Sequence, residues 1–207
     1  MNSAAEVLGL GPVIPVVVLD EATLAVPLAK ALGRGGIRTI EVTLRTPAAL
    51  DAIARLVSEV PDMVVGAGTI TEPGQADRAA KVGAQYLVTP GCTDRLLDEA
   101  RDTGLACLPG VSTVSEAMSL AERGARAMKF FPAEPSGGVP YLKAIAGPLP
   151  GLRFCPTGGI TPDNAPEYLA LPNVGCVGGS WLASTALIAA EEWGQIEALA
   201  RRAATLR

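Results

Sequence analysis

The chain has 207 residues, of which 49% are hydrophobic and 18% are charged, and its formal net charge is −4. This composition excludes intrinsic disorder, and the length suits one domain with a substantial core, so we expect residues 1–207 to form a single domain. Its lysines and arginines form no cluster, which argues against nucleic-acid binding because phosphate neutralisation needs grouped cations.

The sequence contains no histidine, which excludes histidine-based triads and histidine ligands for zinc. The cysteines lack the paired spacing of a zinc site, so we interpret them as reduced, mostly buried residues of a cytoplasmic protein: Cys92, Cys107, Cys155 and Cys176. We expect no signal peptide, and no apolar run reaches the roughly 20 residues that a membrane-spanning helix needs. Acid–base chemistry must therefore come from Glu, Asp, Lys, Tyr or Cys side chains. We expect no metal site and no cofactor.

Apolar segments rich in β-branched residues alternate with segments of helical spacing along the chain. Ser3 with Glu6, and Thr113 with Glu116, match the capping box that opens a helix. In chain order we predict a helix over 3–10, a strand over 13–19, a helix over 21–32, a strand over 39–44, a helix over 47–60, a strand over 63–67, a helix over 74–82, a strand over 86–88, a helix over 93–101, a strand over 105–108, a helix over 113–123, a strand over 127–131, a helix over 139–145, a strand over 153–155, a helix over 162–169, a strand over 174–177 and a helix over 189–203.

Eight such strand–helix units, with no linker between them, favour an α/β fold with a parallel sheet. We predict a single closed (β/α)8 TIM barrel preceded by a short N-terminal helix. The alternative is a doubly wound open sheet, which would usually carry a glycine-rich fingerprint after its first strand. Here the first strand is followed by Asp20 and Glu21, with no glycine.

A lysine stands within an apolar run that is typical of a buried strand, Ala127-Met128-Lys129-Phe130-Phe131. Lysine is rarely buried, and burial disfavours its charged ammonium form. A neutral buried amine is a nucleophile that can form a Schiff base with a ketone. The alternative is a strand-end lysine whose stem packs against apolar neighbours while its ammonium reaches water.

The two-residue period of a strand indicates which side chains accompany this lysine. Glu41 and Arg45 share one face of their strand, and Lys129 shares a face with Phe131. If these faces point into a barrel, Glu41, Arg45 and Lys129 gather at one end of an apolar interior, where barrel enzymes hold their active sites. The alternative is a purely structural salt bridge between Glu41 and either Lys129 or Arg45.

Glycines follow the last two predicted strands, at Gly158-Gly159 and at Gly178-Gly179-Ser180. Loops after the seventh and eighth strands of a barrel often bind phosphate through backbone N–H groups. Glycine is also common in ordinary turns, so the loops alone do not decide the matter. We further predict substrate contacts from three residues at strand ends, Pro90, Phe131 and Thr157.

Six blocks of sequence resemble the bacterial 2-keto-3-deoxy-6-phosphogluconate (KDPG) aldolases, which include 4-hydroxy-2-oxoglutarate (KHG) aldolases. The lysine block and the Glu-x-x-x-Arg block are the most specific, and the similarity runs in order over residues 11–182. The blocks are Glu41-Val42-Thr43-Leu44-Arg45-Thr46, Val65-Gly66-Ala67-Gly68-Thr69, Pro109-Gly110-Val111-Ser112-Thr113, Lys129-Phe130-Phe131-Pro132-Ala133-Glu134, Pro156-Thr157-Gly158-Gly159-Ile160 and Gly178-Gly179-Ser180-Trp181.

The resemblance implies a class I aldolase, a carbon–carbon lyase of the Entner–Doudoroff pathway, that forms cytoplasmic homotrimers and uses no metal. It would cleave KDPG to pyruvate and glyceraldehyde 3-phosphate, and also KHG to pyruvate and glyoxylate. Lys129 would form the Schiff base, Glu41 would be the general acid and base, and Arg45 with Thr69 would hold the pyruvyl carboxylate. The phosphate would lie on Gly158, Gly159, Gly178, Gly179 and Ser180.

Two other functions stay open from the residues themselves. One is a phosphosugar isomerase or synthase on the same barrel, and the other is an inactive barrel that only binds a sugar phosphate. Both would bind phosphate without a covalent bond to Lys129. The sequence leaves open the stereochemistry of the substrate, of the gluconate or the galactonate series.

Overall fold

The structure is a computed structural model that describes residues 3–206, and its nine strands are all parallel within two sheets. The larger sheet has the order β5-β4-β3-β2-β1-β9, and the smaller has the order β6-β7-β8. The strands are β1 (Val13–Val17), β2 (Thr39–Thr43), β3 (Val64–Gly68), β4 (Tyr86–Val88), β5 (Ala106–Leu108), β6 (Gly110–Val111), β7 (Ala127–Phe130), β8 (Arg153–Pro156) and β9 (Val177–Gly179).

The predicted closed, eight-stranded TIM barrel is therefore wrong, because the ladders divide into a six-stranded and a three-stranded sheet. At one boundary, Pro109 separates β5 from β6. Proline has no N–H to donate to a neighbouring strand. The N–H of the next residue, Gly110, donates to the side-chain hydroxyl of Thr89 at 3.0 Å and not to a strand. At the other boundary β8 and β9 meet only at isolated bridges, Phe154 with Val174 and Thr157 with Gly178. The alternation of strands with helices was predicted correctly, but continuous closure was not.

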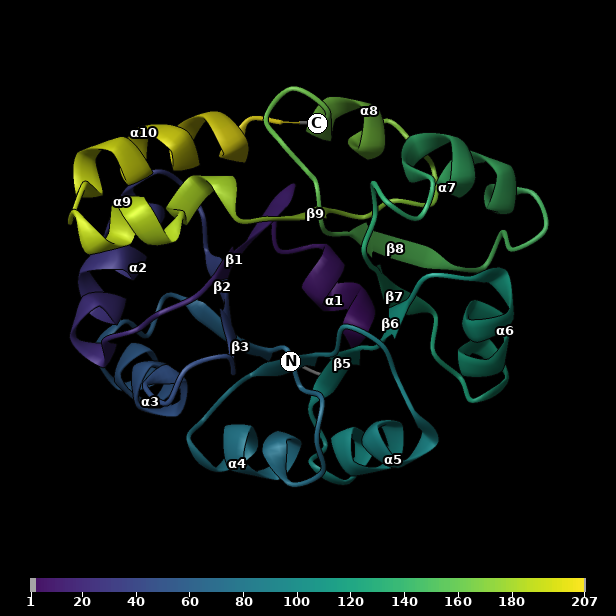
Figure 1. Ribbon diagram of the computed structural model, residues 1–207, viewed down its shortest axis with the longest axis horizontal. Helices are drawn as coiled ribbons and strands as arrows, with labels where there is room; N and C mark the ends of the chain where they lie inside the picture. The colour runs from purple at the N-terminus through teal and green to yellow at the C-terminus, as the bar shows by residue number, and fades with distance from the viewer. Residues whose placement is uncertain (1–2, 207) are drawn as a thin grey trace.

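All helices except the first, α1, lie around the outside of the two sheets (Figure 1). The last predicted helix, 189–203, begins later, at Trp193, and a short unpredicted helix ends at Ala189; Glu191, with a φ of +53°, separates the two. The helices are α1 (Ala4–Leu8), α2 (Ala25–Arg34), α3 (Ala49–Glu59), α4 (Gln75–Lys81), α5 (Asp94–Asp102), α6 (Val114–Glu122), α7 (Gly138–Ala146), α8 (Ala165–Leu169), α9 (Thr185–Ala189) and α10 (Trp193–Ala204), with 3₁₀ turns η1 (Ala22–Leu24) and η2 (Trp181–Ala183).

Buried apolar residues form two layers. The larger layer joins the helices to the outer faces of the strands and includes Ile40, Val42 and Met128. The smaller layer lies on the inner faces and contains residues of both sheets, Tyr86 from β4 and Cys155 from β8 among them. Because adjacent residues of a strand point to opposite faces, Met128 outward places Lys129 inward.

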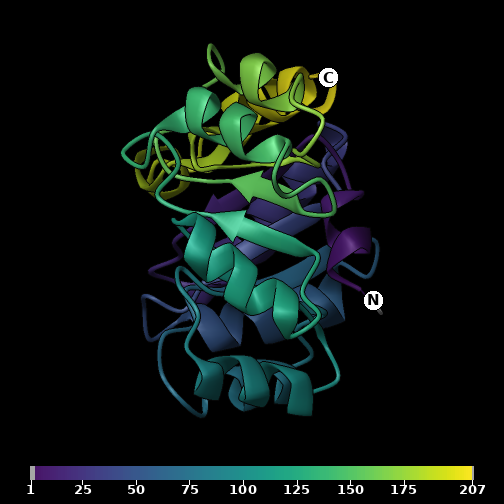
Figure 2. The same ribbon diagram turned by 90° about the vertical axis from the view of Figure 1, so that its right-hand side faces the viewer.

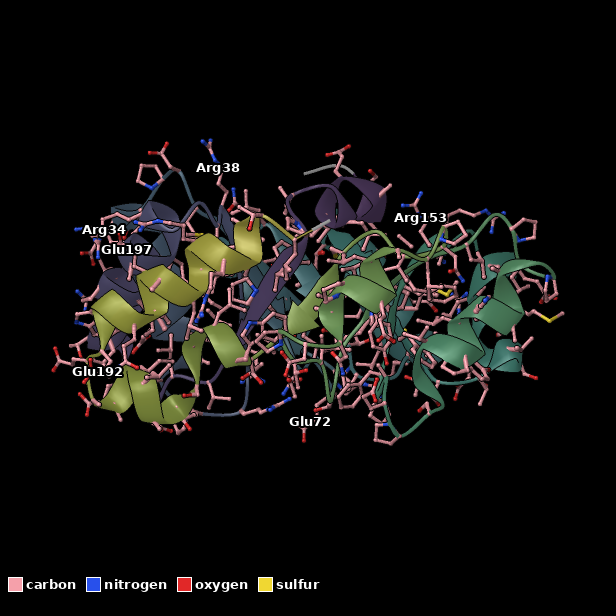
Figure 3. All side chains as sticks on the ribbon, turned by 90° about the horizontal axis from the view of Figure 1, so that it is seen from above. Arg34, Arg38, Glu72, Arg153, Glu192 and Glu197 are labelled. Atoms are coloured by element: carbon pink, nitrogen blue, oxygen red, sulfur yellow. The ribbon has the colours of Figure 1, made fainter. Side chains whose placement is uncertain are left out.

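Helix α1 lies across one end of the sheets, where Val7 and Leu8 join the inner layer (Figures 1 and 2). The amino ends of the strands are at this end, since Arg38, just before β2, and Arg153, the first residue of β8, lie on the side of α1 (Figure 3). Glu72, which follows the carboxyl end of β3, lies on the opposite side (Figure 3). The structure thus has an α1 end and an open end at the carboxyl ends of the strands. Over residues 3–206, no helix has both the length and the apolar character needed to cross a membrane.

Candidate active site

Lys129 and Glu41 face each other inside the molecule. The amine Nζ of Lys129 on β7 donates a hydrogen bond of 3.2 Å to Oε1 of Glu41 on β2, and each side chain is only 4% exposed. The two residues are 88 positions apart in the chain, and they come from different sheets. A buried ion pair is weak evidence for stability, because desolvation of both charges offsets their attraction. Its presence here therefore favours a chemical role over a structural one.

Two glycines on the inner face of β3 make room for the side chains of the neighbouring strands. A Cβ at Gly68 would lie 2.1 Å from Oε1 of Glu41, so the carboxylate occupies the space that a side chain would fill. A Cβ at Gly66 would lie 2.2 Å from the ring of Tyr86, which reaches over β3 from β4. In the register, Glu41 and Tyr86 both lie opposite Gly66, but the carboxylate reaches Gly68 while the Tyr86 ring stays over Gly66, so the carboxylate is nearer the open end.

Hydrogen bonds fix the other inward residues of β2. Thr39 and the Tyr86 hydroxyl are 2.9 Å apart, and Thr43 donates to the backbone carbonyl of Val17 at 2.8 Å. Burial raises the pKa of Tyr86 well above its usual value, and the negative charge of Glu41 raises it further. Tyr86 is therefore a neutral phenol below Glu41, and β2 has little freedom to shift.

Arg45 and Thr69 lie together just beyond the carboxyl ends of β2 and β3. The Nε of Arg45 donates a hydrogen bond of 3.2 Å to the hydroxyl of Thr69. Thr69 has a φ of +57°, an uncommon conformation for a residue other than glycine, and such strain often accompanies functional sites. The remaining N–H groups of the exposed Arg45 can pair with a carboxylate in bidentate geometry.

Phe131 connects the lysine to the first predicted phosphate loop. Its ring centroid is 5.5 Å from Nζ of Lys129, and a Cβ on Gly158 would lie 3.3 Å from the same ring. Gly158 has a φ of +97°, which a residue with a side chain rarely adopts. The other loop is adjacent, because Thr157 and Gly178 form a bridge. The two loops predicted to bind phosphate thus lie beside each other and beside Phe131.

The remaining predicted residues lie at the same end, and their surroundings differ. Pro90 packs against β6, since a Cβ at Gly110 would lie 2.3 Å from the carbonyl of Pro90. Gly159 faces the side chain of Glu134, and Gly179 lies against the ring of Trp181. Ser180 is exposed at the start of η2, where its side chain makes no capping hydrogen bond. Of these four, only Ser180 has a side-chain hydroxyl, and it is accessible to a ligand.

Two buried thiols, Cys155 and Cys176, lie near the Lys129–Glu41 pair. A hydrogen bond with Cys155 and burial raise the pKa of the Cys176 thiol well above its ordinary value. Cys155 stands beside Lys129 in the register of β7 and β8, and both cysteines are buried. A neutral buried thiol is a poor nucleophile, so Cys176 does not compete with the amine of Lys129 for an electrophile.

This arrangement suits chemistry on a carbonyl compound. A buried amine can add to a ketone, and the carboxylate 3.2 Å away can take up and return protons. A guanidinium at the mouth and two glycine loops could hold the two anionic ends of a substrate. A family model described as "KDPG and KHG aldolase" matches residues 4–199.

The chain belongs to the KDPG and KHG aldolase family. A 2-dehydro-3-deoxy-phosphogluconate aldolase from Pseudoalteromonas atlantica is 51% identical over 201 residues, which cover 97% of this chain and 94% of that protein. The KHG/KDPG aldolase of Escherichia coli K12 is 49% identical over 202 residues, which cover 98% and 95%. A solved KDPG aldolase of Legionella pneumophila, with pyruvate captured at low pH as a covalent carbinolamine intermediate, matches with a TM-score of 0.96 and 44% identity over 98% of each chain.

Sequence reasoning missed the residues that pack around the Lys129–Glu41 pair of this aldolase family member. Gly66 and Gly68 stood out only as part of a strand end, and Tyr86 only as the start of a strand. The available signal was the spacing of the two glycines, which puts both on one face of β3. What those glycines accommodate depends on the register of β2, β3 and β4, which the sequence does not specify.

Proposed function

We propose that this chain is a class I aldolase that cleaves KDPG to pyruvate and glyceraldehyde 3-phosphate, and KHG to pyruvate and glyoxylate. The observation that carries the proposal is the buried amine of Lys129, 3.2 Å from the buried carboxylate of Glu41. The family supports it, because the Legionella relative holds pyruvate covalently as a carbinolamine. The reaction places the enzyme in the Entner–Doudoroff pathway.

The proposed reaction begins when the amine of Lys129, after losing a proton, adds to the C2 ketone of the substrate. Loss of water gives an iminium, which withdraws electrons from C3. Glu41, acting through a water molecule, removes the proton of the C4 hydroxyl, and the C3–C4 bond breaks. The aldehyde leaves, and the electron pair of that bond forms an enamine of pyruvate. Glu41 returns a proton to C3, and water hydrolyses the resulting iminium to pyruvate and free Lys129.

The ends of the substrate are held by residues at the open end of the strands. Arg45 pairs with the carboxylate next to C2, in the bidentate geometry that lysine cannot supply, and Thr69 orients the guanidinium through their 3.2 Å hydrogen bond. Pro90, Phe131 and Thr157 contact the carbon chain between the two anionic groups.

The phosphate of KDPG binds to the glycine loops. Backbone N–H groups at Gly158, Gly159, Gly178 and Gly179 and the hydroxyl of Ser180 provide the donors. The absence of side chains at the glycines lets the phosphate approach the backbone closely. KHG lacks this phosphate, so its binding relies more on Arg45, Thr69 and Lys129 at the pyruvyl end.

The assembly and location of the protein are further parts of the proposal, based on the family resemblance. Residues 1–207 form one domain, three copies assemble into a homotrimer, and the enzyme works in the cytoplasm. Sedimentation equilibrium tests the assembly, and a mass three times that of the 21.1 kDa chain is the expected result. A monomer at micromolar concentration would contradict it.

The activity is tested by assaying KDPG and KHG side by side with Lys129→Arg. The variant should lose turnover of both, because guanidinium stays protonated and cannot form the imine. Lys143→Arg is the matched control, since Lys143 is exposed on α7. Near-normal cleavage by Lys129→Arg would refute the Schiff-base role of Lys129, whereas no cleavage by the wild-type protein would favour an isomerase or an inactive binding protein.

A further inference from the structure

A second concave region lies at the α1 end, away from the proposed active site. This cavity of about 490 Å³ is bounded by α1 and α5 and by the amino ends of β5, β7 and β8. Ala127, the first residue of β7, forms part of its wall, whereas Lys129 lies two residues further toward the open end. The cavity and the lysine are therefore on different levels of the same strand.

Three arginines from separate parts of the chain surround this cavity. Arg101 comes from the last turn of α5, Arg126 precedes β7, and Arg153 begins β8. Within residues 3–206, no acidic side chain lines the cavity, although the chain as a whole has a net charge of −4. Positive charge is thus concentrated at this cavity although the chain as a whole is negative, and this local charge attracts anions.

The three guanidinium groups have unused donors. Arg126 donates to the carbonyls of Ala121 and Ala125, and Arg153 donates to the carbonyl of Val174 at 3.2 Å. Arg101 donates to the carbonyl of Arg123. None of the three forms an ion pair with a carboxylate in the part of the chain that the structure describes. A guanidinium has five N–H donors, so each retains at least three for a ligand.

A structural role accounts for only part of this arrangement. Arg101 and Arg126 bond to carbonyls at the carboxyl end of α6, where cations are favourable. Arg153 belongs to another element and bonds elsewhere, yet it lines the same cavity. The nearby carboxylates of Asp94 and Asp98 are already paired with Arg123, so they do not neutralise the three arginines.

The rest of the wall is apolar and includes Leu97, Leu105, Ala106 and Pro109. Apolar walls with a few placed charges are typical of sites for small organic molecules. Arginine suits phosphate in particular, because its planar fork matches two phosphate oxygens. We propose that this cavity binds a small organic anion with two or more phosphate groups, whose carbon skeleton lies on the apolar wall.

The test is calorimetric titration of the full chain with ATP, and with inorganic tripolyphosphate as a probe that has charge but no carbon skeleton. We expect one saturable ATP site that Arg126→Gln with Arg153→Gln weakens by about tenfold or more, because charge-assisted hydrogen bonds are lost. Arg38→Gln is the matched control, an exposed arginine at the same end that does not line the cavity (Figure 3). ATP binding should be unchanged in this control, and tripolyphosphate should bind the wild-type protein more weakly than ATP does.

Hydrogen exchange on the wild-type protein locates the ligand without any substitution. ATP should slow exchange in peptides that cover residues 3–10 and 101–107. Slowed exchange confined to residues 156–159 and 178–180 would place ATP on the glycine loops and overturn the proposal. Absence of saturable binding, equal binding by the double variant, or tripolyphosphate binding as tightly as ATP would also overturn it.

Discussion

Gly68→Ala tests whether the position of the Glu41 carboxylate controls turnover. The added Cβ would lie 2.1 Å from Oε1 and 2.5 Å from Cγ of Glu41. To reach even 3.0 Å from this methyl group, the oxygen must retreat by about 0.9 Å. Glu41 is 3% exposed and bonded to Lys129, so its carboxylate can move only by leaving its present position beside the amine.

The size of the effect follows from that displacement. A misplacement of about 1 Å in an active site costs roughly 10²-fold in rate, and complete loss of a general acid or base costs about 10²–10⁴-fold. We therefore expect kcat for KDPG cleavage to fall by about 10²-fold or more. Imine formation with pyruvate should persist, because the amine itself is untouched.

The assay pairs steady-state cleavage of KDPG with borohydride trapping of pyruvate, read by intact mass. Gly147→Ala is the matched control, because a Cβ there meets nothing within 4 Å and φ is −66°. Thermal unfolding identifies any variant that is simply misfolded. A Gly68→Ala protein that folds and turns over KDPG at a near-normal rate would refute the reasoning.

Three further predictions follow from neighbouring contacts. Gly66→Ala should lower the free energy of unfolding by about 1–3 kcal/mol in urea, because its Cβ would overlap the fully buried ring of Tyr86; unchanged stability would contradict this packing. Arg45→Lys should reduce kcat/KM for KHG by about tenfold or more, since one bidentate carboxylate contact is lost. A kcat/KM equal to that of the wild-type protein would show that Arg45 does not hold the substrate carboxylate. Glu116 accepts the backbone N–H groups of Ser112 and Thr113, and the Ser112 bond most strongly lowers its pKa below the usual 4.5. The folded state thus favours the ionised carboxylate, so Glu116→Ala should lower the free energy of unfolding by about 1 kcal/mol at pH 7. The difference in unfolding free energy between wild type and variant should shrink as the pH falls below about 4.5. A difference that grows in acid would contradict this sign.

The order of the elements could be predicted because each strand is a short apolar run bounded by glycine, proline or a capping residue. The Thr113–Glu116 capping box, for example, forms as predicted at the start of α6. The pairing of the strands could not be predicted in full. Whether neighbouring strands share a ladder depends on single N–H groups, such as that of Gly110, which binds the Thr89 hydroxyl. No periodicity in the sequence reports that choice.

The candidate site was predictable where the two-residue period of a strand applied. That period placed Glu41 and Lys129 on inward faces, and the structure brings them to 3.2 Å. Their support could not be predicted, because Gly68 and Tyr86 act on Glu41 through the register of three strands. The positive φ of Thr69 could not be predicted from the sequence either, since threonine rarely adopts this conformation.

The most direct test of the central claim is to incubate the protein with pyruvate and borohydride and to map the adduct by peptide mass spectrometry. The account predicts one pyruvate-derived adduct per chain, on the peptide that contains Lys129, and none in Lys129→Arg. An adduct on another lysine, or no adduct on a protein that cleaves KDPG, would contradict the claim that this buried amine forms the covalent bond.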